Sequence, residues 1–401
     1  MDIKSDINKS SKNAAIKRKI ISYYLFNNTS TLPDLAKVLN ISVPTVTKLI
    51  SELTEKGYII NYGKLETNEG RPPTLYGLNP DSGYFIGVDI KKFSLHFALM
   101  NLVGDIVEYK MGINCILENS QNGLNTLCHY INEFINGLTI NKNKILKIGI
   151  NISGRVNPDS GYSFSIFNFE ERSLSDVISE KIGYDVYIDN DTRAMTYGEF
   201  IKGNVKGERN IIFINLSWGL GSGLILNGKL FMGKSGFSGE FGHFNVFDNE
   251  IICQCGKRGC LETEVSGAAL YRQLLQCIDE GKQSILSSRI KKNISKLTLY
   301  DIVDATNKED LLCIELIEEI GQKLGRYLAG LINLLNPELV IIGGVLAQTE
   351  DYILQPIKSS VRKYSLNLVN KDSEIVLSKL QEKAGVVGAC MLARNKMFEL
   401  F

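Results

Sequence analysis

The feature that most constrains the fold is a pattern of short strands that occurs twice in the chain. Residues 84–107 (YFIGVDIKKFSLHFALMNLVGDIV) alternate apolar and polar side chains in three runs separated by turn residues. About 125 residues later, residues 210–231 (NIIFINLSWGLGSGLILNGKLF) repeat the pattern, with turns at Trp218-Gly219 and Asn227-Gly228. Helical and strand segments follow each copy. The sequence therefore predicts two similar α/β lobes, with the cleft between them as the expected ligand site.

Polar residues follow two of the predicted strands. The run over 145–152 ends at Ser153-Gly154-Arg155, and the run over 184–188 ends at Asp189-Asn190-Asp191. Side chains just beyond the carboxyl ends of strands face the ligand crevice of open α/β sheets. These residues are therefore candidates for a binding site.

The length of 401 residues predicts two or three domains. Asn79-Pro80 is a turn signal and marks the first boundary. A long helix over 311–335 and a strand over 339–342 are expected in the second lobe, and a final helix from Gly385 is expected to pack on the first. The predicted domains are 1–80, then 84–200 completed by 381–401 as lobe 1, and 201–380 as lobe 2.

The first 80 residues carry a helix-turn-helix pattern. Thr31 and Ser42 are expected N-cap residues, each with a proline in the first helical turn (Pro33 and Pro44). Asn40 tolerates the left-handed conformation that ends the first of these helices. Apolar residues at helical spacing lie on both sides of the turn. Two short helices joined in this way are typical of DNA-binding modules, although a helical hairpin used only for packing is the alternative.

The segment after this hairpin favours the DNA-binding interpretation. Residues 58–62 and 74–78 are predicted strands around a polar loop, which makes a winged helix-turn-helix. Exposed residues of the second helix are expected in the major groove, and an arginine at the wing tip in a minor groove. The candidate DNA-contacting residues are Ser42, Thr45, Thr47, Lys48 and Arg71.

Charge is distributed unevenly along the chain. The formal net charge is +1, but residues 1–80 carry 11 Lys/Arg against 7 Asp/Glu, and the remainder carries 34 against 37. A basic head on a mildly acidic body is compatible with a nucleic-acid-binding module fused to another domain. The chain has no apolar run of membrane-spanning length and begins with a polar segment, so we expect a cytoplasmic protein without a membrane partner.

Three of the eight cysteines form a short cluster, Cys253-Gln-Cys255-Gly-Lys-Arg-Gly-Cys260, with His243 ten residues upstream. Three thiolates and one imidazole complete a tetrahedral shell without an open position, which predicts a structural zinc site. Reduced thiols without a metal are the alternative. The other five cysteines are expected as small core residues. These are Cys115, Cys128, Cys277, Cys313 and Cys390.

The segment Gly239-Glu240-Phe241-Gly242-His243, followed by the cysteine motif and Glu262, resembles the signature of the ROK family (repressors, open reading frames and sugar kinases). The resemblance extends from Gly70-Arg71-Pro72 to Gly388. It implies a two-lobed, actin-like fold of the ribonuclease H and hexokinase type, with a sugar in the interlobe cleft. It also implies that zinc is bound by His243, Cys253, Cys255 and Cys260.

The resemblance further implies a set of sugar-binding residues. A hexose presents several hydroxyls, and carboxylates together with an amide can read them. If one nitrogen of His243 binds zinc, its other N–H can meet a sugar hydroxyl. Structural roles are the alternative, such as Asn190 capping the following helix. The implied sugar-binding residues are Gly154, Arg155, Asn190, Asp191, Glu240, His243 and Glu262.

The first hairpin argues against kinase activity. Kinases of the family have Asp-x-Gly-Gly-Thr there, whereas this chain has Asp89-Ile90-Lys91-Lys92-Phe93, so the backbone cannot approach a phosphate as closely. ATP is therefore not an expected cofactor. Asp191, at the position of the kinase general base, is expected to be vestigial, and no catalytic residue is predicted. The Gly219-x-Gly221-x-Gly223 run is by itself weak evidence for a nucleotide.

The sequence thus predicts a sugar-responsive transcriptional regulator, most simply a repressor of carbohydrate-utilisation genes, and not an enzyme. The expected partners are operator DNA, a sugar or sugar derivative, and a second copy of the chain in a homodimer or higher homo-oligomer. Sugar binding is expected to close the lobes and change the angle between the recognition helices. An ATP-dependent sugar kinase with a DNA-binding extension is one alternative, and an inactive kinase used as a scaffold is another.

Overall fold

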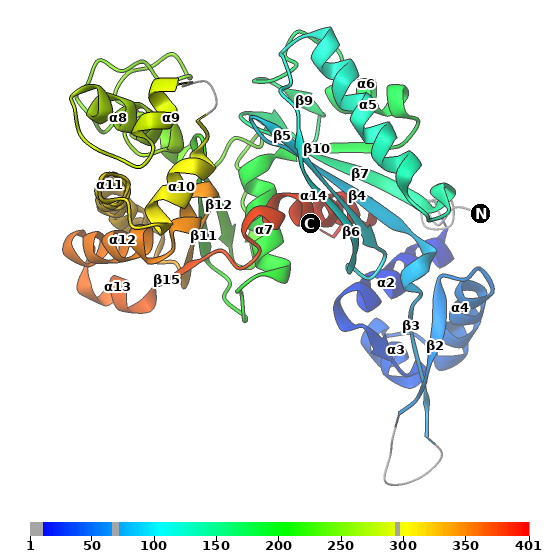
Figure 1. Cartoon of the computed structure of the whole chain (residues 1–401). Coiled ribbons are helices and arrows are strands. Elements are labelled where there is room, and N and C mark those ends of the chain that lie inside the picture. The colour runs from blue at the N-terminus through cyan, green and yellow to red at the C-terminus, as the bar shows by residue number, and fades with distance from the viewer. Residues whose placement is uncertain (1–10, 66–71, 293–296, 401) are drawn as a thin grey trace. The chain divides into compact units, whose positions relative to one another are not determined.

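A computed structural model describes residues 11–65, 72–292 and 297–400 of the chain (Figure 1). The described residues form two compact units. The first consists of residues up to Ile152, Pro158–Ile188 and the residues from Ala389 onward, and the second consists of Ser153–Asn157 and Asp189–Gly388. Each unit is built on a five-stranded sheet of its own.

In the described residues, the first unit begins with a small module of three helices and three short strands. Its sheet has the strand order β1-β3-β2, and all of its neighbouring strands are antiparallel. The elements are α2 (Lys12–Asn27), β1 (Thr29–Ser30), α3 (Leu32–Leu39), α4 (Val43–Glu55), β2 (Ile59–Lys64) and β3 (Thr74–Leu78). This is the predicted winged helix-turn-helix, with β1 as an additional strand that was too short to be recognised from its sequence.

Helix caps define the helix-turn-helix. The Thr31 side chain accepts a hydrogen bond from the Asp34 backbone N–H, and α3 ends at Asn40 in the left-handed conformation. The Ser42 side chain then accepts a hydrogen bond from the Thr45 backbone N–H at the start of α4. These three predicted signals are confirmed. The apolar face of α4 is fully buried, as expected from its spacing, and consists of Val46, Leu49, Ile50 and Leu53.

The sheet of the first unit has the order β10-β7-β4-β5-β6. Strands β4, β5 and β6 form antiparallel pairs, and β7 lies parallel to β4. The strands are β4 (Tyr84–Ile90), β5 (Ser94–Asn101), β6 (Ile106–Asn114), β7 (Ile145–Ile152) and β10 (Val186–Asn190). The other elements are η1 (Pro80–Ser82), α5 (Gln121–Gly137), η2 (Lys142–Lys144), β9 (Tyr162–Ser163) and α6 (Leu174–Ile182).

The sheet of the second unit repeats this topology with the order β13-β12-β11-β14-β15. Again three antiparallel strands lie on one side, and parallel strands follow on the other. The strands are β11 (Ile211–Leu216), β12 (Leu220–Leu226), β13 (Lys229–Leu230), β14 (Leu339–Gly343) and β15 (Glu374–Leu377). The predicted duplication is therefore visible strand by strand.

Helices cover this second sheet and share one apolar core with it. The longest, α11 (Leu311–Leu335), has the predicted bounds and ends at Asn336 in the left-handed conformation. The other helices are α7 (Asp191–Lys202), α8 (Gly267–Asp279), α9 (Ser287–Lys292), α10 (Leu299–Asn307), η6 (Val345–Thr349), α12 (Asp351–Tyr364), α13 (Asn367–Asp372) and η7 (Gln381–Lys383).

The final helix, α14 (Ala384–Phe398), packs on the first sheet through its second half. The Cys390 thiol lies 3.8 Å from the carbonyl oxygen of Phe85 and 3.7 Å from that of Ala98. The Phe398 ring packs edge-on against the Phe85 ring, with 6.4 Å between centroids. The predicted return of the final helix to the first lobe is thus confirmed. The domain boundaries at residues 200 and 380 stay predictions. The compact units have different limits, since the second unit contains Asp189–Gly388.

None of the helices among the described residues is long and apolar enough to cross a membrane. Of the five isolated cysteines, Cys128, Cys313 and Cys390 are buried, whereas Cys115 and Cys277 are half-buried. Burial raises the pKa of the Cys313 thiol to about 12, and the nearby Asp310 carboxylate adds to the effect. The predicted core position is thus confirmed for Cys128, Cys313 and Cys390, whereas Cys277 packs at the edge of the core and Cys115 is only half-buried.

Candidate functional site

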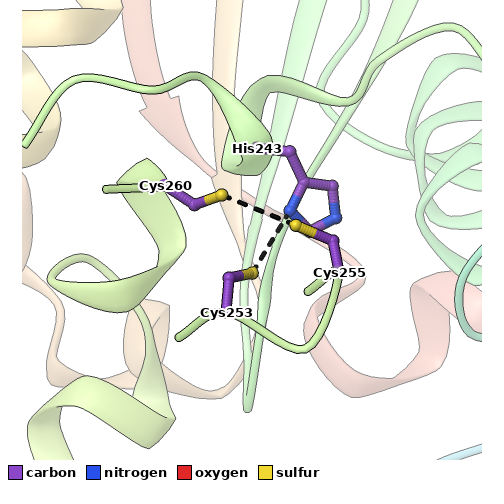
Figure 2. A group of neighbouring side chains, drawn as sticks. All are labelled: His243, Cys253, Cys255 and Cys260. Atoms are coloured by element: carbon purple, nitrogen blue, oxygen red, sulfur yellow. Dashed lines mark hydrogen bonds between the residues drawn. The ribbon is translucent and has the colours of Figure 1, made fainter. Parts of the chain in front are cut away.

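His243, Cys253, Cys255 and Cys260 converge in the second unit (Figure 2). One donor atom from each side chain lies within 4.8 Å of the others. The Cys253 sulfur is 3.5 Å from His243 Nδ1, and the Cys255 and Cys260 sulfurs are 3.6 Å apart. Three sulfurs and one imidazole nitrogen are the donor set of a tetrahedral structural zinc site. The cluster predicted from the sequence can therefore hold a metal ion.

Tight turns bring these ligands together. His243 ends the short helix η3 (Phe241–His243), and Cys260 directly precedes η4 (Leu261–Thr263). Gly259 has a φ of +69°, and a Cβ there would lie 2.1 Å from the Phe247 carbonyl oxygen. Only glycine fits at this position, because a side chain would meet backbone in a left-handed turn.

The three thiols differ in their environments. Burial raises the pKa of the Cys253 thiol. Burial acts on Cys255 in the same direction, but hydrogen bonds from the Lys257 backbone N–H and from the Cys253 and Cys260 thiols hold its pKa below the ordinary value. The thiolate form of Cys255 is thus favoured, and cysteine binds a metal ion as the thiolate.

Two glutamates extend the cluster toward neighbouring elements. His243 Nε2, the ring nitrogen that faces away from Cys253, lies 3.5 Å from Glu240 Oε2. Glu262 Oε1 accepts from the Cys253 thiol at 3.6 Å, and Glu262 Oε2 accepts the Leu220 backbone N–H at 2.8 Å. Glu262 therefore connects the cysteine segment to the start of β12. Glu240 is exposed.

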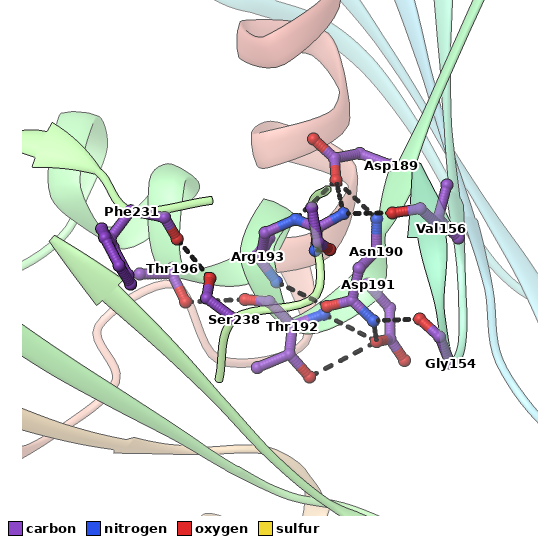
Figure 3. A network of polar contacts seen from close by, with 11 residues as sticks. Gly154, Val156, Asp189, Asn190, Asp191, Thr192, Arg193, Thr196, Phe231 and Ser238 are labelled. Atoms are coloured by element: carbon purple, nitrogen blue, oxygen red, sulfur yellow. Dashed lines mark hydrogen bonds and ion pairs between the residues drawn. The ribbon is translucent and has the colours of Figure 1, made fainter. Parts of the chain in front are cut away.

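A second polar network lies where β10 meets α7 (Figure 3). Asn190 is the N-cap of α7, and its Oδ1 accepts the Arg193 backbone N–H. Its Nδ2 donates to the Gly154 carbonyl oxygen at 2.8 Å and to Asp191 Oδ1 at 3.1 Å. Asn190 thus caps the following helix, which is the structural role considered for it above. Its amide group also holds Asp191 and Gly154 in place. Arg155, the neighbour of Gly154, is exposed.

Arg193 is the site residue that sequence reasoning missed. Its guanidinium is almost fully buried, at 3% exposure, and pairs with Asp189 Oδ1 through Nε at 2.7 Å. It also donates to the carbonyl oxygens of Val156, in β8 (Val156–Asn157), and Gly236. One cation thus holds together three segments around Asn190 and Asp191. In the sequence, the only sign of this ion pair is that the acid and the arginine lie four residues apart.

Three glycines of the second unit have close neighbours: Gly219 just before β12, Gly221 in β12 and Gly343 in β14. A Cβ at Gly219 would lie 2.5 Å from Glu262 Oε2, and a Cβ at Gly221 would lie 2.3 Å from Thr192 Oγ1. At Gly343, a Cβ would lie 2.4 Å from the Phe213 ring. Close packing thus accounts for glycine at positions 221 and 343, whereas at position 219 the nearest atom is the end of the flexible Glu262 side chain, which can move aside. Strand β12 therefore lies next to two groups of polar residues. Glu262, which extends the metal cluster, contacts the start of the strand, and α7, which carries the network around Asn190, packs beside it.

The first hairpin carries an internal ion pair where kinases of the family have glycines. Lys91 Nζ lies 2.7 Å from Asp89 Oδ2, and the Asp89 carboxylate is fully buried. Lys92 lies over the Phe93 ring at 5.3 Å from its centroid. The lysine thus neutralises the aspartate of this motif from within the chain.

The four described DNA-contact candidates lie at the start of α4. Ser42, Thr47 and Lys48 are exposed, and Thr45 is half-buried. The Ser42 and Thr45 hydroxyls are 2.8 Å apart, and the Thr47 hydroxyl donates to the Val43 carbonyl oxygen at 2.9 Å. Arg71, the candidate at the wing tip, lies outside the described residues.

Comparison with known proteins defines the class. Residues 85–396 match the ROK family model, so the chain belongs to the ROK family. Residues 14–60 match the winged helix-turn-helix DNA-binding class. Together, the two matches identify a DNA-binding transcription regulator with a body of the ROK sugar-kinase type.

Individual relatives cover most of the chain. It is 28% identical over 383 residues to the xylose repressor of Caldicellulosiruptor bescii, and the matched residues cover 95% of this chain and 96% of the relative. It is 30% identical over 320 residues to the glucokinase of Halalkalibacterium halodurans, covering 78% of this chain and 96% of the kinase. A crystal structure of a ROK family transcriptional regulator, a homologue of the E. coli MLC protein, matches with a TM-score of 0.78 and 27% identity, covering 96% of both chains.

Proposed function

We propose that this protein is a sugar-responsive transcriptional repressor. As a homodimer it binds operator DNA through α4 and the wing, and a sugar bound to the second unit weakens that binding. The observation that carries the proposal is the combination, in one chain, of a winged helix-turn-helix with a ROK body whose Asp89 is already paired with Lys91. Relatives named as repressors that match over nearly the whole chain support it.

The sugar is held by the two polar groups that flank β12. Asn190 and Asp191 present an amide and a carboxylate in one hydrogen-bonded arrangement, which suits the paired hydroxyls of an aldose. Glu240, His243 and Glu262 supply a second set of acceptors and donors beside the metal cluster. Gly154 and Arg155 complete the proposed site, with Gly154 kept in place by Asn190.

The metal in the cysteine cluster is zinc, and its role is structural. The four donors leave no open position for a water or substrate. When bound, zinc would keep Nδ1 of His243 occupied and leave Nε2 for a ligand hydroxyl or for Glu240. Elemental analysis should find one zinc per chain, and Cys255→Ser should lower that content and the melting temperature.

The test of the function measures DNA and sugar binding in the same protein. A duplex enriched from a random-sequence pool by the full chain should bind in fluorescence anisotropy, and one sugar from a panel of aldoses and their phosphates should release it. Asp191→Asn should bind the duplex normally and lose the sugar response. Asp279→Asn, an exposed carboxylate at the end of α8, is the matched control and should respond as the natural chain does. A chain that enriches no duplex refutes the proposal.

Asp191 favours one second candidate, an ATP-dependent sugar kinase, because it stands at the position of the kinase base. A coupled assay of ATP consumption over the same sugars distinguishes the two. Turnover that Asp191→Asn abolishes would replace the repressor by a kinase with a DNA-binding extension.

A further inference from the structure

We infer that Val43, the first residue of α4, reads the 5-methyl group of a thymine in each operator half-site. The inference rests on the proposed operator binding and adds a specificity-determining residue to it. All the DNA-contacting residues predicted from the sequence are polar or charged.

Val43 is exposed, unlike the apolar residues on the buried face of α4. The apolar face of α4 is between 0 and 2% exposed at Val46, Leu49, Ile50 and Leu53, whereas Val43 is 43% exposed. Pro44 and Thr47 beside it are exposed as well. The N-terminal residues of a recognition helix are those that contact base edges in the major groove. An apolar side chain is therefore presented at the position that reads bases.

The composition of α4 excludes the commonest base contacts. Its sequence, VPTVTKLISELTE, contains no arginine, asparagine or glutamine. Together with lysine, these are the side chains that bond bidentately to guanine or adenine, and α4 offers only Lys48 of this kind beside its serine and threonine hydroxyls. Glu52 is engaged with Lys17, at 2.7 Å. The helix must therefore obtain much of its specificity in another way.

The hydroxyl groups near Val43 are engaged within the module. Ser42 caps α4 and lies 2.8 Å from the Thr45 hydroxyl, and the Thr47 hydroxyl donates to the Val43 carbonyl oxygen. Each of these hydroxyls already has a partner inside the module, and Val43 adds exposed apolar surface beside them. The thymine methyl is the one apolar group on the major-groove edges of the four bases, and aliphatic side chains contact it there.

The experiment replaces single thymines by deoxyuridine, which removes only the methyl group. The duplex is one enriched from a random-sequence pool by the full-length chain, and affinities are measured by fluorescence anisotropy at one salt concentration. At one thymine of each half-site, the replacement should weaken binding of the natural chain roughly fourfold, the effect of one buried methyl-sized group. Val43→Ala should bind the thymine and deoxyuridine duplexes equally at that position.

Val38→Ala is the matched control, because Val38 is an equally simple exposed valine, 60% exposed, on α3. It should keep the full response to deoxyuridine. Enriched half-sites without a thymine would overturn the inference. So would a response to deoxyuridine that is the same in Val43→Ala and in the natural chain. A chain that binds no duplex at all refutes the operator binding itself and the inference with it, and is thus distinguishable from failure at Val43 alone.

Discussion

At the scale of single residues, Glu199 shows how one buried carboxylate supports the second unit. Its side chain is fully buried on α7. Oε1 accepts hydrogen bonds from the Ser378 hydroxyl at 2.5 Å and from the Leu380 backbone N–H at 2.6 Å. The carboxylate thus ties α7 to the segment that follows β15. A buried donor without its acceptor costs more than an ordinary hydrogen bond contributes.

Glu199→Ala should therefore lower the free energy of unfolding by about 2–4 kcal/mol, because it leaves two donors unsatisfied in the interior. Glu199→Gln keeps the acceptor oxygen and should lose clearly less. Urea unfolding of both variants measures the difference. Equal losses would mean that side-chain volume, and not the acceptor, is what matters at this position.

Asp310 is expected to make the stability depend on pH. It is the N-cap of α11, and its carboxylate accepts the backbone N–H groups of Cys313 at 3.0 Å and Ile285 at 2.7 Å. Burial alone would raise the pKa of Asp310, but these backbone hydrogen bonds hold it below its ordinary value. The folded-state pKa is thus lower than the unfolded one. The resulting stabilisation is present above the ordinary pKa and is lost as the pH falls through the folded one.

Asp310→Asn should remove this contribution. The natural chain should exceed the variant in unfolding free energy near pH 6, and the excess should shrink as the pH falls toward about 3. Urea unfolding at a series of pH values measures this excess. Curves that stay parallel over the whole range would contradict the assignment.

At the scale of elements, α7 and β12 fit together residue by residue. Thr192 and Thr196 lie one helical turn apart on α7 and face Gly221 and Gly223 on β12. Four helical residues rise about 6 Å and two strand residues rise nearly 7 Å, so the two rows stay in register. A Cβ at Gly223 would lie 2.0 Å from the Thr196 hydroxyl oxygen. The helix can approach the strand only because these positions lack side chains.

Gly223→Ala should consequently destabilise the protein by about 1–3 kcal/mol through overpacking. Thr196→Ala in the same chain should recover part of this loss, because it removes the hydroxyl oxygen that the new methyl group meets. The matched control is Gly330→Ala in the exposed part of α11, where a Cβ meets nothing within 4 Å. That change should be neutral or stabilising by up to about 1 kcal/mol. Thermal or urea unfolding compares the three variants.

At the scale of the whole molecule, the net charge of +1 is unevenly distributed along the chain. The first 80 residues carry 11 basic against 7 acidic side chains, and the remainder carries 34 against 37. The electrostatic attraction to the phosphate backbone is therefore modest and confined to one end of the chain. In the proposed homodimer, base contacts and the second copy of the chain would then supply much of the operator affinity.

Binding to non-specific duplex should accordingly be weak, toward the 10⁻⁴ M end of the range of roughly 10⁻⁴–10⁻⁶ M at physiological salt. Its decrease with salt concentration should be shallow. Fluorescence anisotropy of an arbitrary duplex over a series of salt concentrations measures both quantities. Tight, steeply salt-dependent binding to that duplex would show that phosphate contacts dominate after all.

Local signals in the sequence predicted much of this fold. Thr31, Asn40 and Ser42 act where their residue types indicated, because capping depends on neighbours within one turn. The bounds of α11 and the six strands of the two repeats also follow from local periodicity. The four residues of the metal cluster were recognisable, because thiols and imidazoles at short spacing have few other uses.

Other features depend on which distant segments meet, and only the tertiary structure decided them. From its sequence, Arg193 is an ordinary helical arginine, yet it is buried against Asp189 and two carbonyl oxygens from other segments of the chain. Gly221 looks like part of a nucleotide loop, but it makes room for Thr192. By itself, the sequence determined the elements, their repetition and the ligand types of the cluster, because these are encoded by neighbours along the chain. Burial and close approach were decided by the fold, since they arise from contacts between residues far apart in sequence.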